Sequence, residues 1–139
     1  MRSLLLLAAL ACAVGCQSKE QKFVEMHRPG NWQQLLDDRV KRQQEWFDAL
    51  LARRAANEPQ MLAFISMLGD AGRRLAASKA GAATNKPGIT QAYVEHRDFC
   101  KKEARSWENA KDGDAAMALR YWRAELADAE ILVASYSSP

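Results

Sequence analysis

Three side chains with metal-binding chemistry fall on one face of a helix that the sequence predicts over residues 89–110. His96, Cys100 and Glu103 are spaced four and then three residues apart, so a helix directs all three to the same side. Imidazole, thiolate and carboxylate are ligands that zinc and other borderline metals accept. The spacing makes this trio a candidate metal site that needs at least one further ligand.

Two other interpretations of the same residues stay open. His27 or Met26 could complete the metal site, and Met26 with His96 could instead hold a b-type haem. The alternative is structural: Cys100 is a buried apolar residue, His96 makes a hydrogen bond, and Glu103 pairs with an arginine across the interface. The structural interpretation is favoured, and we expect no cofactor.

Catalytic patterns are not found in the sequence. It contains no glycine-rich phosphate loop, no Gly-x-Ser-x-Gly and no His-Glu-x-x-His. Most Asp and Glu residues fall on the polar faces of predicted helices, where solvation explains them. We therefore do not expect an enzyme.

Tryptophan provides the candidate for a protein contact. Trp46 lies next to Phe47 but off the main apolar seam of its predicted helix. Large aromatic side chains often anchor protein interfaces. We expect Trp46 and Phe47 to form an exposed contact for a partner.

The first residues have the layout of a secretory signal: Arg2, an apolar run over residues 4–11, and small residues before Cys16. Ala13-Val14-Gly15-Cys16 resembles the lipobox of bacterial lipoproteins. That resemblance implies that residues 1–15 are a removed signal peptide and that Cys16 carries the lipid. Gln17 after the cysteine implies the periplasmic face of the outer membrane if the cell has two membranes.

The rest of the chain is long enough for one domain behind a tether over residues 16–30, which could reach at most ~50 Å. Without the signal it has 19 Lys and Arg against 17 Asp and Glu, a balance that does not favour nucleic-acid binding. Cys100 is then the one cysteine that is neither removed nor lipidated, so no internal disulfide is expected.

The domain, residues 31–137, is predicted to be all-α. Apolar residues alternate at spacings of three and four over four segments, 31–56, 59–80, 89–110 and 115–136. Such alternation is typical of helices packed at a shallow angle, and short connections make neighbours antiparallel. We predict an up-down four-helix bundle or two antiparallel hairpins. Gly72, inside the second helix, predicts a close contact with another helix.

Residues 91–100 provide a second resemblance. Gln91-Ala92-Tyr93 followed by Arg97-Asp98-Phe99-Cys100, then a glycine turn, is similar to the LprI-type lysozyme-inhibitor family of small secreted or lipid-anchored proteins. The resemblance covers about 45 residues. It implies a helical hairpin that inhibits a cell-wall hydrolase.

Three functions therefore stand as hypotheses. The first is a membrane-anchored binding or scaffolding module of the cell envelope, without catalysis, that contacts another envelope protein. The second is an inhibitor of a cell-wall hydrolase. The third is a helical bundle that binds a metal ion or haem.

Overall fold

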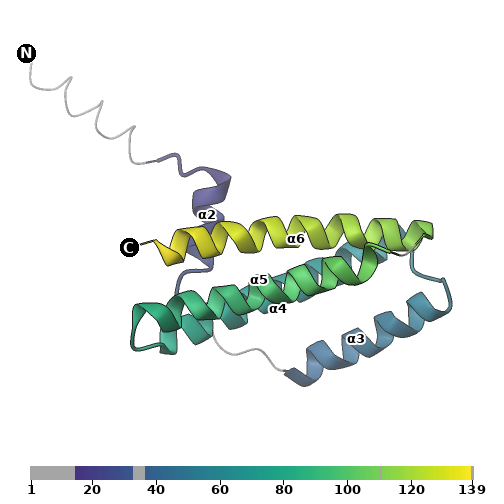
Figure 1. The fold of residues 1–139 in the computed structure, drawn as a ribbon, viewed down its shortest axis with the longest axis horizontal. Helices are drawn as coiled ribbons and strands as arrows, with labels where there is room; N and C mark the ends of the chain where they lie inside the picture. Colours follow the sequence, from purple (N-terminus) through teal and green to yellow (C-terminus); the bar gives the residue numbers. More distant parts are fainter. Residues whose placement is uncertain (1–14, 33–36, 110, 139) are drawn as a thin grey trace, which may run out of the picture.

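The computed structural model describes residues 15–32, 37–109 and 111–138, which fold into helices without strands (Figure 1). The helices, in chain order, are α2 (Lys19–Met26), α3 (Asp37–Ala52), α4 (Glu58–Ala82), α5 (Lys86–Trp107) and α6 (Gly113–Ser137). This confirms the predicted all-α bundle. The predicted signal peptide falls, except for Gly15, outside the described residues.

The three long helices form the centre of the molecule. α5 packs along α6, and α4 packs against both. α3 lies beside α4, and α2 lies against the C-terminal end of α6 (Figure 1). The bundle therefore has three closely packed helices and a fourth, α3, that contacts mainly one of them.

Side-chain caps decide where the long helices begin. The side chain of Asn57 accepts the Gln60 amide at the start of α4, and Asn85 accepts the Gly88 amide at the start of α5. Asp112 caps α6 through the Ala115 amide. Because Asn85 is a cap, the connection between the predicted segments 59–80 and 89–110 shortens to residues 83–85.

The helix predicted over residues 31–56 is shorter than expected. Asn31 and Trp32 are not helical, and the Asn31 side chain donates to the Met26 carbonyl instead of capping a helix. Residues 33–36 lie outside the described part. α3 ends at Ala52, where Arg54 takes a positive φ of 51°. Hydrogen bonds from Arg54 to Leu51 and from Ala55 to Leu50 complete a Schellman turn.

Two apolar clusters fill the interior. The larger joins α4, α5 and α6 to the C-terminal half of α3 around Met61, Ile65 and Trp122. The smaller lies at the opposite end around Tyr93 and Leu132. Phe23 and Val24 of α2 pack against the smaller cluster, so this part of the predicted tether belongs to the folded unit.

No helix among the described residues is long and apolar enough to cross a lipid bilayer.

Candidate functional site

A groove of about 640 Å³ runs between α3, α4 and α5. Most of its lining residues are apolar and one is a buried histidine: Leu68, Ala71, Gly72, Leu75, Ala76, Ala92, His96 and Phe99, with Val40 from α3. Polar side chains also line it: Lys41, Gln44, Glu45, Lys79 and Glu95. Its volume lies within the range of natural small-molecule sites, ~300–1,000 Å³.

The groove exists because α3 is attached at one end. Phe47 stacks on Phe64 of α4 with ring centroids 3.8 Å apart, which fixes the C-terminal half of α3. Towards its other end α3 contributes only Val40 to the apolar lining. The facing surface of α4 carries small residues between its two leucines, Ala71 and Gly72 among them, and these leave space unfilled.

His96 lies at the base of the groove between two close neighbours. A Cβ atom added to Gly72 would come within 2.4 Å of His96 Nδ1, so only glycine allows this approach of α4 and α5. The predicted close contact at Gly72 is confirmed. On its other side, His96 Nε2 lies 3.7 Å from Cys100 Sγ.

Burial keeps this pair neutral. Desolvation lowers the pKa of His96 to about 4 and raises the pKa of Cys100 to about 12. The imidazole is therefore uncharged at neutral pH and the thiol is not a thiolate. The thiol therefore lacks the thiolate form of a nucleophile, and the imidazole is a weak base because its pKa lies far below neutral pH.

The predicted metal trio is only partly brought together. His96 and Cys100 are in contact, but in the described part of the chain no three His, Cys, Asp or Glu side chains are grouped so that they could hold a metal ion. Glu103 is partly buried, and burial raises its pKa. The proposed set of His96, Cys100 and Glu103 is therefore not assembled as a metal site.

Neither of the proposed additional ligands completes the site. His27 Nδ1 lies 2.8 Å from the Phe23 carbonyl and its Nε2 is 3.4 Å from Arg73 Nε. Met26 is 49 % exposed, whereas His96 is buried against Gly72 and Cys100. The geometry thus offers no free pair of axial ligands for a haem between Met26 and His96.

The predicted aromatic contact divides into two residues with opposite environments. Trp46 is 56 % exposed, as expected for a surface contact. Phe47 is 2 % exposed and stacks on Phe64, so its assignment to the contact patch is wrong. Phe47 attaches α3 to the bundle instead.

A buried group of charged residues was missed from the sequence. Arg73 of α4 forms an ion pair with Glu125 of α6, and their side chains are only 11 % and 12 % exposed. Arg73 also lies 3.9 Å from Asp70. Burial raises the pKa of Glu125, and the Arg73 guanidinium opposes that shift.

One sequence feature could have indicated this group. Gly69 lies one turn before Arg73, and a Cβ atom there would fall on the Glu125 carboxylate. A glycine inside a long helix is costly, by roughly 1 kcal/mol, and so indicates a position where another group approaches the backbone.

Comparison of the chain with protein-family models, with curated proteins and with solved structures finds no match.

Proposed function

We propose that this chain is a lipid-anchored binding module of the bacterial cell envelope that holds the hydrocarbon chain of an amphiphilic ligand in the groove between α3, α4 and α5. The observation that carries the proposal is the elongated apolar groove of about 640 Å³. The lipobox ending in Cys16 supports the anchor. The absence of an assembled catalytic group among the lining residues supports binding without chemistry.

The length of the groove suits a chain that lies along α4. The α4 residues that line it run from Leu68 to Lys79, a rise of about 16 Å along the helix axis.

The lining favours a hydrocarbon for a second reason. A bound peptide in extended form would bring backbone N–H and C=O groups that need hydrogen-bond partners. Of the polar side chains that line the groove, His96 is the one that is buried, and it is neutral at neutral pH. A hydrocarbon chain needs no such partners and gains roughly 25 cal/mol for each Å² of apolar surface that is buried.

The charged residues that line the groove suit a polar head group outside it. Lys79 pairs with Glu95 at 3.1 Å, and both are about half exposed. Lys41 lines the groove from α3. These ammonium groups can stay hydrated while they contact the head group of an amphiphile.

A titration tests the groove directly. The chain from residue 16 onwards, with Cys16→Ser so that it stays unlipidated, is titrated with a fluorescent fatty acid. We expect saturable one-to-one binding. Ala71→Trp places a large side chain in the groove and should weaken binding at least tenfold.

Ala127→Trp is the matched control, because Ala127 is exposed on α6 and does not line the groove. It should bind the probe like the parent chain. Equal binding by both tryptophan variants, or no saturable binding by the parent chain, contradicts the proposal.

A further inference from the structure

The segment 19–32, called the strap below, is tied to the bundle by hydrogen bonds to its main chain. Tyr93 donates to the His27 carbonyl at 2.5 Å, and Tyr136 donates to the Val24 carbonyl at 2.6 Å. The Gly30 amide donates to the Ala77 carbonyl at 2.8 Å. The strap therefore contacts α4, α5 and α6, although the sequence indicated a tether.

Two arginines of α4 hold its aromatic residues. Arg73 lies 5.4 Å from the centre of the Phe23 ring, and Arg74 lies 4.1 Å from that of Trp32. Such cation–π contacts stabilise the docked position of the strap. Arg74 also pairs with Asp70 of the same helix at 2.8 Å, and this ion pair orients the Arg74 guanidinium that Trp32 contacts.

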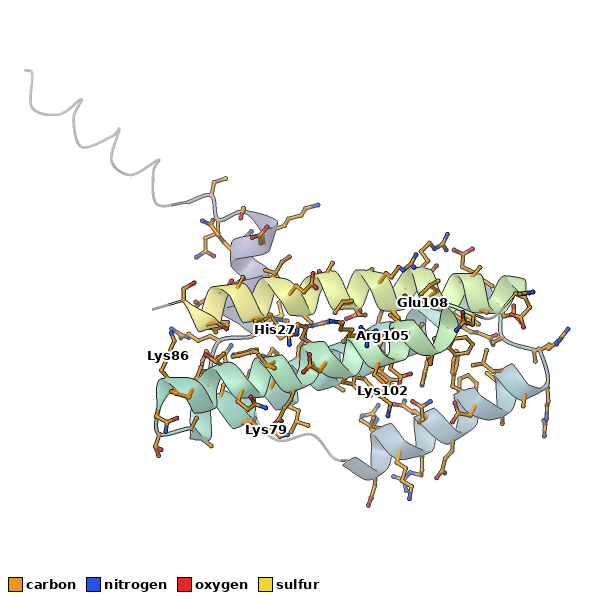
Figure 2. All side chains as sticks on the ribbon, viewed as in Figure 1. His27, Lys79, Lys86, Lys102, Arg105 and Glu108 are labelled. Atoms are coloured by element: carbon orange, nitrogen blue, oxygen red, sulfur yellow. The ribbon has the colours of Figure 1, made fainter. Side chains whose placement is uncertain are left out.

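His27 is the centre of this interface, and it is 2 % exposed. Figure 2 shows it lying among the helices of the bundle. Its Nδ1 is 2.8 Å from the Phe23 carbonyl, which can only accept, so Nδ1 carries the proton. Arg73 Nε lies 3.4 Å from Nε2 and can only donate, so Nε2 is unprotonated. The docked strap thus requires a neutral imidazole.

We propose that the strap is an acid-released latch: it holds the bundle close to the membrane at neutral pH, and protonation of His27 releases it so that the binding groove can reach further from its anchor. This inference depends on the lipid anchor at Cys16 that is part of the proposed function.

Protonation at Nε2 would place a second positive charge against the guanidinium that now donates to it. Desolvation lowers the pKa of His27 and Arg73 adds to this shift, while the Phe23 carbonyl at Nδ1 and Asp70, 3.9 Å from Nε2, oppose it. The charged and titratable groups near His27 come from every adjoining element: Glu25 and Arg28 of the strap, Asp70, Arg73 and Arg74 of α4, Tyr93 and His96 of α5, and Glu125 and Tyr136 of α6.

The sign of the pH effect follows from the lowered pKa. A released His27 titrates near the ordinary value of 6.5, whereas the docked one resists protonation. Docking is therefore strongest above pH 6.5. Below it the docking equilibrium constant falls by up to about tenfold per pH unit until the lowered pKa is reached.

Release changes the reach of the domain. With the strap docked, residues 16–18 alone join the lipid to the folded unit, a span of about 10 Å at most. The 14 strap residues would add up to ~50 Å when released. The groove lies on the side of the bundle near α3, away from α2 (Figure 1), so the docked strap does not block it.

The test uses the full lipidated chain in phospholipid vesicles at about pH 7.5 and pH 5.5, one unit on either side of the ordinary histidine pKa. Amide hydrogen exchange of residues 19–32 measures release. Energy transfer from a dye at Arg53→Cys to acceptor lipids measures the distance of the bundle from the membrane. His27→Gln has no imidazole to protonate. Because intrinsic amide exchange depends on pH in the same way in both chains, comparison with this variant also removes that dependence.

Relative to His27→Gln, we expect strap opening in the parent chain to rise by up to about tenfold at the lower pH, with lower energy transfer, while α6 exchange relative to His27→Gln stays unchanged. The degree of strap opening in His27→Gln should be the same at the two pH values. Equal pH responses of the strap in the two chains, or α6 exchange that rises relative to His27→Gln as much as strap exchange does, overturns the latch. A chain that does not float with the vesicles overturns the anchor instead.

Discussion

Gly72→Ala should destabilise the protein, although alanine is the better helix former. A methyl group there would come within 2.4 Å of Nδ1 and 2.5 Å of Cε1 of His96, well inside van der Waals contact. Alanine gains about 1 kcal/mol in helix propensity, and overpacking a tight site costs about 1–3 kcal/mol. We expect a net loss of roughly 1 kcal/mol in the free energy of unfolding.

Urea denaturation monitored by circular dichroism measures this change. Gly113→Ala is the control, because a Cβ atom at Gly113 meets nothing within 4 Å, and it should leave stability unchanged or slightly higher. His96→Ala removes the imidazole, so Gly72→Ala should be stabilising in that background. A Gly72→Ala effect of the same sign and size in both backgrounds would refute the close contact.

Three further predictions concern the buried groups. Glu125→Gln should lower the free energy of unfolding by about 3 kcal/mol because it leaves a buried guanidinium without its main partner, whereas Glu130→Gln on the exposed face should change it by less than ~0.5 kcal/mol; urea denaturation of the two variants compares them. Because the pKa of His96 is lowered, the free energy of unfolding of the parent chain should fall by up to about 3 kcal/mol relative to that of His96→Gln as the pH falls from 6.5 to 4. Above pH 6.5 the difference between the two chains should stay constant. Phe47→Ala should lower the free energy of unfolding by about 3–5 kcal/mol and Trp46→Ala should lower it far less, as measured by thermal unfolding. Equal losses would show that the two environments are misassigned.

The helical bundle could be predicted because its three long helices follow local rules. The alternation of apolar residues, the caps at Asn57 and Asn85, and the glycine at position 72 each act through nearby residues or through a repeating face. The predicted ends of the helices were within a few residues of the observed ones where a side-chain cap decided them. Where a backbone motif decided, as at Arg54, the prediction ran too long.

The groove and the buried charges depend on tertiary packing that no single segment encodes. Phe47 belongs to the apolar seam of its helix and lies beside exposed Trp46, and its stack on Phe64 joins α3 to α4. The polar composition of residues 17–30 indicated a tether, because the partners of the strap are distant tyrosines and arginines. The burial of Arg73 could not be predicted because its partner Glu125 lies 52 positions away.

The measurement that tests the central claim most directly is photocrosslinking of the full-length protein in bacteria fed a diazirine fatty acid, with the crosslinked positions mapped by mass spectrometry. If the groove holds a hydrocarbon chain, crosslinks should concentrate on residues 68–79 of α4 and 92–99 of α5, and Ala71→Trp should remove them while Ala127→Trp leaves them. Crosslinks confined to the residues next to Cys16, or unchanged by Ala71→Trp, would contradict it, because they would reflect the nearby bilayer and not a bound ligand.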